Sequence, residues 1–232
     1  MATIYLIPAP LHEDVLEPLP VYVKTAILSC EVFFVENERT TRRYFKKIDS
    51  SIVIDNYTWV AMKEVTHDIR EQFIQKIKAN KTIGIVSEAG CPGIADPGQE
   101  LVAVAHQYKA IVKPLTGPSS ITLALMASGF NGQQFSFHGY LPVEETDRSR
   151  KIKQLEELSA KTRGTQIFIE TPYRNQKLYN AIIQNCRPAT RLCVAMNITS
   201  PYEQILTMTV AEWKRFPIDL HKKPAIFLLY AG

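Results

Sequence analysis

The feature that most constrains this chain is a short apolar segment, Thr82 to Val86, that runs directly into the loop SEAGCPGIADPG, residues 87 to 98. The nine residues from Gly90 to Gly98 hold three glycines and two prolines. Glycine lets the main chain come within contact distance of a ligand, and proline holds the bend rigid. Because α/β sheets hold small molecules at the carboxyl ends of their strands, this loop predicts a ligand-binding turn.

A second loop of the same kind follows about twenty residues later. The apolar segment Ile111 to Leu115 ends in Thr-Gly-Pro-Ser-Ser, residues 116 to 120, and enters an apolar helix. Hydroxyl groups and free N–H groups gather where such a helix begins. Taken alone, this loop is typical of a turn plus a helix cap, and neither loop matches GxxxxGK[ST] or GxGxxG. The recurrence of the pattern favours one ligand shared by both loops.

Six motifs in a fixed order carry a family resemblance. They are IYLIPAP from Ile4, ENERTTRR from Glu36, SEAGCPGIADPG from Ser87, PLTGPSS from Pro114, FHGYLP from Phe137 and FIETPYR from Phe168. This series resembles the tetrapyrrole methylase superfamily. Within it the motifs are most similar to the 16S rRNA ribose 2′-O-methyltransferase type, which shows TPIGNL, AEDTRxTRxLL, SDAGTPxISDPG, PLPGPSA, GFLP and YExPHR in this order. The resemblance spans nearly the whole chain.

The resemblance implies a fold, a cofactor and an assembly. The fold is two α/β domains of the class III adenosylmethionine methyltransferase type, with the cofactor cleft between them. The cofactor is S-adenosylmethionine, and the enzyme is a homodimer that acts on ribosomal RNA or the small ribosomal subunit. The residues that would bind the cofactor are Pro8, Ala9, Pro10, Gly90, Cys91, Pro92, Ala95, Gly117, Ser119, Ser120, Glu170, Thr171, Asn197, Ile198, Pro224 and Ala225.

Two positions depart from the rRNA type. After the first strand this chain has Leu-His-Glu-Asp, residues 11 to 14, in place of Ile-Gly-Asn-Leu, and near the C-terminus it has Lys-Lys-Pro, residues 222 to 224, in place of Lys-Gly-Glu. These changes leave the cofactor class intact and put the rRNA substrate in question. Cys91 stands where the family usually has Thr, and a small side chain in a tight loop explains it better than a reactive thiol.

Alternating apolar segments predict a largely parallel sheet in the first half and a mixed sheet in the second. Strands are expected at 3–7, 32–35, 51–54, 82–86 and 111–115, with helices at 15–29, 40–48, 68–79 and 100–108. The second half is expected to open with a helix at 119–128 and to continue through strands at 134–139, 166–170, 191–197, 204–208 and 225–230. The resemblance and the change of pattern place a domain boundary at Leu115, giving domains 1–115 and 116–232.

Composition excludes several classes of protein. No segment has the eighteen or more uninterrupted apolar residues of a membrane span, and the first ten residues lack the basic start and apolar core of a signal peptide, so a cytoplasmic enzyme is expected. Four cysteines without a CxxC pair or matching histidines indicate neither a zinc site nor a disulfide framework. No metal is therefore expected.

Basic residues gather in two clusters. The net charge of +4 is mild, so their distribution says more than their number. The clusters flank cofactor motifs and predict contacts to RNA phosphates, although a solvated helix face would explain either cluster alone. The RNA-binding candidates are Arg39, Arg42, Arg43, Lys46 and Lys47 in the first cluster and Arg148 and Arg150 in the second.

A ribose hydroxyl has a high pKa, so its attack on a methyl group would be helped by a base or an oriented carboxylate. The candidates, all at expected strand ends or in the loop beyond, are Glu36, Glu88, Asp96 and Glu170. The sequence does not single out one of them. Two other functions stay open: a methylase acting on a tetrapyrrole or another small molecule, and a non-catalytic homologue that binds the cofactor or RNA.

Overall fold

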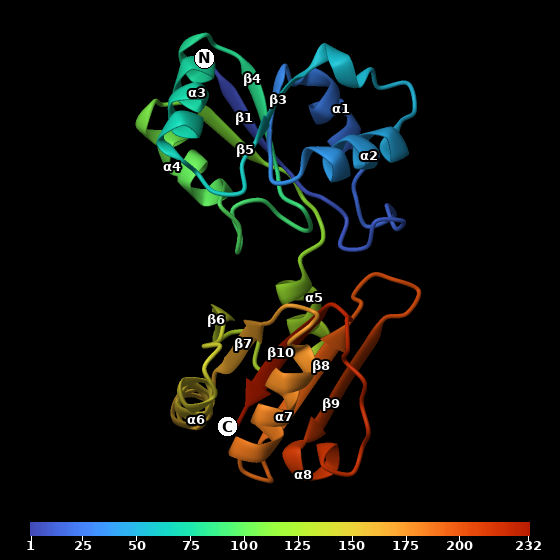
Figure 1. The fold of residues 1–232 in the computed structure, drawn as a ribbon, viewed down its shortest axis with the longest axis vertical. Helices are drawn as coiled ribbons and strands as arrows, with labels where there is room; N and C mark the ends of the chain where they lie inside the picture. Colours follow the sequence, from blue (N-terminus) through green and yellow to red (C-terminus); the bar gives the residue numbers. More distant parts are fainter. The chain divides into compact units, whose positions relative to one another are not determined.

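The computed structural model describes all residues from Met1 to Gly232, and the chain divides into two compact units, Met1–Ser119 and Ser120–Gly232 (Figure 1). The loop after the fifth strand stays with the first unit: Leu115 N donates to Leu6 O at 3.0 Å, and Thr116 N donates to Tyr22 Oη at 2.7 Å. The observed division therefore falls after Ser119, whereas the sequence placed the boundary at Leu115.

The first unit is a parallel sheet with helices on both faces (Figure 1). Its strand order is β3-β2-β4-β1-β5, and every neighbouring pair is parallel. Helices α1 and α2 cover one face and α3 and α4 the other (Figure 1). The elements are β1 (Thr3–Ile7), α1 (Tyr22–Ser29), β2 (Val32–Val35), α2 (Glu38–Ile48), η1 (Ile54–Asn56), β3 (Thr58–Ala61), α3 (His67–Lys78), β4 (Thr82–Val86), α4 (Gly98–Gln107) and β5 (Ile111–Pro114).

Strand β2 shows why the sheet is buried on both faces. Its residues alternate between two apolar cores: Val32 and Phe34 pack with α3 and α4, and Phe33 and Val35 pack with α1 and α2. Successive side chains of a strand point to opposite faces of the sheet, and here helices cover both faces. The sequence of a central parallel strand is therefore apolar at consecutive positions. The parallel sheet expected from the first half of the sequence is confirmed.

Two expected elements of the first unit were wrong. The strand at 51–54 is instead a turn and the short helix η1, and the third strand is β3, Thr58–Ala61. The Asp49 carboxylate accepts from Ser51 N at 2.8 Å and from Ser51 Oγ at 2.7 Å, and these bonds hold the turn. The helix expected from residue 15 begins only at Tyr22, because Pro18 and Pro20 lack N–H donors and disfavour helix at the residues before them.

The second unit contains a mixed sheet of order β6-β7-β10-β8-β9, as the sequence indicated. Strands β6 and β7 are parallel, and the pairs β7–β10, β10–β8 and β8–β9 are antiparallel. One core lies between the sheet and α6, α7 and α8, while α5 packs on β9 and β10. The elements are α5 (Ser120–Ser128), β6 (Phe135–Tyr140), α6 (Glu145–Thr162), β7 (Thr165–Ile169), α7 (Asn175–Asn185), β8 (Arg191–Met196), β9 (Gln204–Thr209), α8 (Val210–Trp213) and β10 (Ala225–Tyr230).

The sequence missed α6, α7 and α8. Helix α6 buries a thin stripe that mixes Ile152 and Leu155 with the polar Arg148, Glu156 and Ser159, so its apolar periodicity is weak. Glu156 is paired, since it accepts from Thr190 Oγ1 and from Arg187 N at 2.8 Å, whereas Arg148 Nε is buried without a hydrogen-bond partner. None of the helices in the structure combines the length and the apolar character that crossing a bilayer requires.

Candidate functional site

Three neighbouring strands of the first unit end at the same edge of its sheet. Residues 8 to 10 follow β1, Glu36 follows β2 and Ser87 follows β4. The first and third of these segments are joined by a two-residue bridge, in which Ala9 N donates to Gly90 O at 2.8 Å and Gly90 N donates to Ala9 O at 3.1 Å. The structure thus brings Pro8, Ala9, Pro10 and Gly90 together as the sequence predicted for one ligand-binding edge.

The bridge also limits what this edge can offer a ligand. Both polar backbone groups of Ala9 are used by Gly90, and Pro8 O accepts from the Tyr44 hydroxyl at 2.7 Å. Pro8, Ala9 and Pro10 are buried. A ligand held here would meet an apolar wall at residues 8 to 10, and its hydrogen bonds would have to come from other groups.

The loop from Gly90 to Gly98 is braced by Asp96. Its Oδ1 accepts from Gly93 N at 2.8 Å and from Gly98 N at 2.7 Å, at the start of α4. Gly90, Gly93 and Ala95 all have positive φ, of 77°, 83° and 62°. Glycine adopts this conformation without a steric cost, whereas Ala95 is strained in it, and such strain gathers at functional sites. The loop therefore has one fixed path.

Cys91 is part of this loop's packing. Its thiol lies 3.6 Å from Gly117 O and 3.5 Å from Pro118 O, so it joins the two loops that the sequence singled out. Burial raises the pKa of this thiol, and the nearby Asp96 carboxylate raises it further. A raised pKa leaves the thiol protonated, which agrees with a packing role rather than a reactive one.

Gly117 makes the closest approach in the site. A Cβ atom at this position would lie 2.1 Å from Pro8 Cβ and 2.5 Å from Pro8 Cγ. The glycine is therefore required by the protein's own packing of the β5 loop on the β1 loop. Gly90 is different, since a Cβ there would meet Leu11 Cδ2 at 3.4 Å, and its requirement for glycine comes from the positive φ.

Glu36, Glu88 and Asp96 form an acidic group at the ends of β2 and β4. Glu36 Oε2 accepts from Glu88 N at 2.6 Å, and Glu88 Oε1 accepts from Asn37 Nδ2 at 3.3 Å. Burial raises the pKa of Glu36; the Asp96 and Glu88 carboxylates add to this, and the hydrogen bond from Glu88 N opposes it. Burial also raises the pKa of Asp96. The edge is therefore a concentration of negative charge that is partly withdrawn from water.

We expect Glu36→Gln to change how stability depends on pH. The pKa of the Glu36 carboxyl is near 4.5 in the unfolded chain and is higher in the folded protein. The stability that protonated Glu36 contributes is present below about pH 4.5 and is lost as pH rises through its folded pKa. Glutamine keeps an oxygen for Glu88 N and has no charge. Urea unfolding should therefore show the variant gaining stability relative to wild type between pH 4.5 and 8.

The matched control for this prediction is Glu64→Gln, a change at an exposed glutamate in the loop before α3. The control should follow the wild-type profile. A Glu36→Gln profile parallel to that of wild type across the whole range would contradict the prediction.

Some basic residues of the cluster on α2 are paired with other groups of the protein, and others are not. Arg42 pairs with Glu38 and lies 5.2 Å from the Trp59 ring centroid. Lys46 Nζ donates to Ser50 O at 2.9 Å, and Lys47 Nζ donates to Asp14 Oδ1 at 2.7 Å. Arg39 and Arg43 are exposed, are four residues apart on the helix, and have no acidic partner. These two arginines are the cations that α2 presents to solvent.

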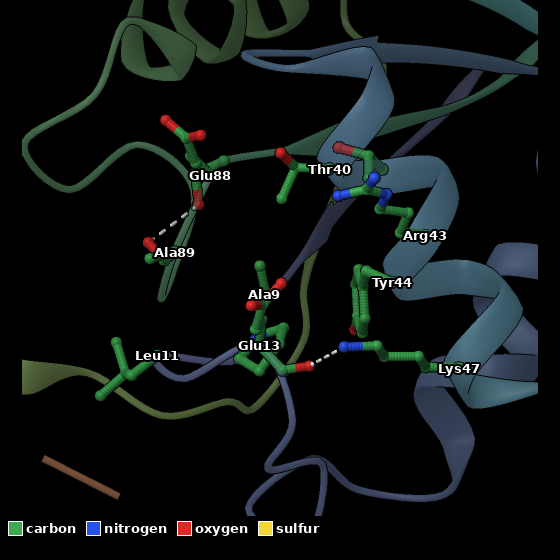
Figure 2. Close-up of a pocket in the computed structure, with 12 residues that line it drawn as sticks. Ala9, Leu11, Glu13, Thr40, Arg43, Tyr44, Lys47, Glu88 and Ala89 are labelled. Atoms are coloured by element: carbon green, nitrogen blue, oxygen red, sulfur yellow. Dashed lines mark hydrogen bonds between the residues drawn. The ribbon is translucent and has the colours of Figure 1, made fainter. Parts of the chain in front are cut away.

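A pocket of about 240 Å³ lies against this face of α2 (Figure 2). Thr40, Arg43 and Lys47 form its helical side, and Lys47 Nζ closes one end by donating to Glu13 O at 2.8 Å (Figure 2). The remaining lining residues are Ala9, Pro10, Leu11, Glu13, Thr41, Tyr44, Ser87, Glu88 and Ala89. The segment at 11–14 that departs from the rRNA type is thus one wall of a pocket whose other walls carry family motifs.

The second unit gathers its predicted residues at one edge as well. Strands β7 and β8 run in the same direction because both are antiparallel to β10. Glu170 and Thr171 follow β7, Asn197 and Ile198 follow β8, and Pro224 and Ala225 open β10 at the same edge. Asn197 N donates to Pro224 O at 3.0 Å. Ser119 ends the first unit and Ser120 begins α5.

Two charged candidates in the second unit are buried and hydrogen-bonded within the protein. Glu170 is buried, and its Oε1 accepts from Arg174 Nη2 and from Thr171 N, both at 2.7 Å. Arg148 is 4% exposed and its guanidinium donates to Val143 O at 2.7 Å, so the prediction that it contacts RNA was wrong. Arg150 is exposed and pairs with Asp147. A charge count along the sequence cannot separate these cases, because burial depends on how α6 docks.

The structure contains no group of three or more His, Cys, Asp or Glu side chains placed to hold a metal ion. It adds one feature that sequence reasoning missed. Thr199, in the turn after β8, has a φ of 69°, which a β-branched residue rarely adopts, and its buried Oγ1 has no hydrogen-bond partner. Because such strain gathers at functional sites, we expect this turn, which also holds Asn197 and Ile198, to belong to the site.

Comparison with known proteins identifies relatives of this chain. The chain is 29% identical over 212 residues to the ribosomal RNA small subunit methyltransferase I of Bacillus subtilis, covering 91% of this chain and 69% of that protein. It is 33% identical over 173 residues to the protein of the same name from Vibrio cholerae, covering 72% of this chain and 59% of that one. No family model matches the chain.

Solved structures share the fold at low sequence identity. Uroporphyrin-III-C-methyltransferase from Thermus thermophilus superposes with a TM-score of 0.60 at 14% identity, over 100% of this chain and 95% of that one. A cobalt precorrin-4 methyltransferase superposes with a TM-score of 0.63 at 15% identity, over 98% and 94%. The chain is a methyltransferase homologous to the ribosomal RNA small subunit methyltransferase I proteins, and it shares the fold of the uroporphyrin-III and cobalt precorrin-4 methyltransferases.

Proposed function

We propose that this protein transfers a methyl group from S-adenosylmethionine to a ribose 2′-hydroxyl of ribosomal RNA. The observation that carries the proposal is the similarity, over 91% of the chain, to a ribosomal RNA small subunit methyltransferase I. The unpaired Arg39 and Arg43 on α2 support it, because they stand beside the predicted cofactor edge with no acidic partner of their own. A small neutral acceptor has no phosphate groups for these arginines to contact.

The first unit suits a cationic cofactor. Asp96 Oδ2 is buried without a hydrogen-bond partner, and Asp96 acts electrostatically on Glu36. Partly buried negative charge favours a sulfonium, and the apolar wall at Pro8, Ala9 and Pro10 excludes water around it. When bound, S-adenosylmethionine would supply a methyl group that is already on a good leaving group. The chain's task is then to hold the acceptor oxygen in line with that methyl group.

Among the carboxylates, we infer that Glu36 or Glu88 accepts the hydroxyl proton. Each accepts only one hydrogen bond within the protein, from Glu88 N and Asn37 Nδ2 respectively, and so keeps an oxygen available. Asp96 is used to brace its loop, and Glu170 is paired with Arg174. A raised pKa, as at Glu36, makes a carboxylate a stronger base at neutral pH.

The direct test is methyl transfer to small-subunit rRNA, offered bare and within the assembled subunit. Labelled S-adenosylmethionine should place the label in one 2′-O-methyl nucleoside, identified by mass spectrometry of the digested RNA. Label in a base would overturn the ribose assignment, and label only in a tetrapyrrole would overturn the RNA assignment.

Removing the unengaged arginines should weaken RNA binding through the phosphate charge. We expect the double change Arg39→Ala and Arg43→Ala to reduce the slope of log affinity against log salt by about two, since each lost phosphate contact lowers it by about one. Affinity for S-adenosylmethionine should stay the same. Filter binding of an rRNA fragment at several salt concentrations measures the slope, and calorimetry measures the cofactor.

The matched control is Arg42→Ala with Lys46→Ala, which removes the same charge from the same helix. These two cations are engaged by Glu38 and Ser50 O, so the slope should change by less than one. Equal slopes in the two double variants would show that the position of the arginines is unimportant, against the proposal.

A further inference from the structure

Three exposed tyrosines stand at the edge of the second sheet where β6, β7 and β8 end. Tyr140, the last residue of β6, is 58% exposed; Tyr173, after β7, is 73% exposed; and Tyr202, after β8, is 76% exposed. The three strands run in the same direction, since β6 is parallel to β7 and both β7 and β8 are antiparallel to β10. Their carboxyl ends therefore share one edge, which spans about 14 Å at about 4.8 Å per strand.

The charges around the tyrosines are mixed. The Arg174 guanidinium is within electrostatic range of Tyr140, and it pairs with Glu170. Lys222 N donates to Pro172 O at 3.1 Å, which places the exposed Lys222 beside Tyr173. Asp219 pairs with Lys223, and Glu203 Oε2 accepts from Thr199 N at 2.7 Å, while Glu144 and Glu145 after β6 are exposed. Lys222 has no acidic partner and is the cation that this edge could offer to a phosphate.

The turn that carries Tyr202 is held in one conformation. Asn197 and Thr199 have φ of 50° and 69°, and Tyr202 N donates to Ser200 Oγ at 3.0 Å. Asn197 Nδ2 donates to Tyr202 O at 3.5 Å. An exposed aromatic ring on a fixed turn loses little entropy when a ligand stacks on it.

We propose that Tyr140, Tyr173 and Tyr202, which we name the tyrosine edge, stack on unpaired bases of the RNA acceptor. This inference rests on the proposed function and adds the substrate class: a single-stranded or looped segment rather than a duplex. Aromatic rings recognise RNA by stacking on bases that have left the helix, and cations beside them hold the backbone. The tyrosine edge offers three exposed rings and the unpaired Lys222, whereas the arginines of α2 offer only phosphate contacts.

The test uses a single-stranded rRNA fragment that carries 2-aminopurine, whose fluorescence is quenched on stacking. Each of Tyr140→Ala, Tyr173→Ala and Tyr202→Ala should weaken binding by about tenfold and reduce quenching, because one stacking contact is lost. The salt slope should stay at the wild-type value, since no phosphate contact is removed. Tyr→Phe at each position is the matched control, and it should keep both the affinity and the quenching.

The outcomes separate this inference from the proposed function. Alanine variants that bind and methylate RNA as wild type does would overturn the tyrosine edge and leave the proposed function standing. Equal binding of a fully paired RNA duplex would overturn the inference in the same way. Alanine variants with normal RNA binding but a reduced mass in light scattering would assign the edge to a second copy of this chain instead. A wild-type protein that binds no RNA at low salt would remove both proposals.

Discussion

Gly117→Ala is expected to disrupt the candidate site without touching a ligand. The new Cβ would lie 2.1 Å from Pro8 Cβ, well inside the contact distance of two carbon atoms, and the proline ring has little freedom to move. Overpacking of this kind costs about 3 kcal/mol, and the melting temperature should fall by roughly 10 °C. Because φ at Gly117 is not in the left-handed region, the whole effect comes from the contact.

The same change should weaken cofactor binding by more than tenfold. Displacing Pro8 strains its hydrogen bond with the Tyr44 hydroxyl and the adjacent bridge between Ala9 and Gly90. Differential scanning calorimetry and titration with S-adenosylhomocysteine measure the two effects. Gly132→Ala is the control, because a Cβ there meets nothing within 4 Å. A Gly117→Ala protein with the melting temperature and affinity of the control would show that the β5 loop is free to move away from β1.

Phe33→Ala is expected to be the most destabilising single change in the first unit. Phe33 is fully buried at the centre of an aromatic cluster, with ring centroids 4.9 Å from Phe45, 5.0 Å from Tyr57 and 5.1 Å from Trp59. Loss of such a ring costs about 3–5 kcal/mol through lost burial and the cavity that remains. The cluster also joins α2 to β2 and β3, so the placement of the α2 arginines depends on it.

A second substitution, at Gly84, tests the same packing around Phe33 more directly. A Cβ on Gly84 would lie 2.5 Å from Phe33 Cδ1, so Gly84→Ala should destabilise the wild-type protein by about 1–3 kcal/mol. In the Phe33→Ala background the ring is absent and the added methyl fills part of the cavity, so the same change should be neutral or stabilising. Urea unfolding of the four proteins in a double-mutant cycle measures the coupling. Additive effects would contradict this packing.

Much of the fold could be predicted from the chain alone. The apolar segments at β1, β2 and β4 are bounded by Gly, Pro and charged residues, and their burial on both faces makes them continuous apolar runs. The order of the six motifs gave the family, which the curated relatives and the shared fold support. Helix α6 could not be seen, because the face it buries includes the charged Arg148 and Glu156, and the partners of Glu156, Arg187 and Thr190, are 31 and 34 residues along the chain.

The sequence predicted which residues would meet at the candidate site, but it did not predict what each residue does there. Pro8, Ala9 and Gly90 were expected to meet, and they do, but the bridge between Ala9 and Gly90 uses the backbone groups that the sequence left open to a ligand. Among the carboxylates, only the structure separates Glu36 and Glu88 from the engaged Asp96 and Glu170. The partners of Asp96 and Glu170 lie within four residues, whereas Glu36 accepts from a residue 52 positions away, which sequence spacing does not imply.

For every strand except β3, the sequence by itself determined where the strand ends and which residues occupy that end, because apolar runs, glycines and prolines act locally on the backbone. The tertiary structure determined which of these residues keep a side-chain group available for a ligand. It paired Lys47 with the loop at 11–14, left Arg39 and Arg43 unpaired, set Gly117 against Pro8, and brought Tyr140, Tyr173 and Tyr202 to one edge. The physical reason is that availability depends on contacts between segments distant in the chain, which only the packing of the sheets and helices creates.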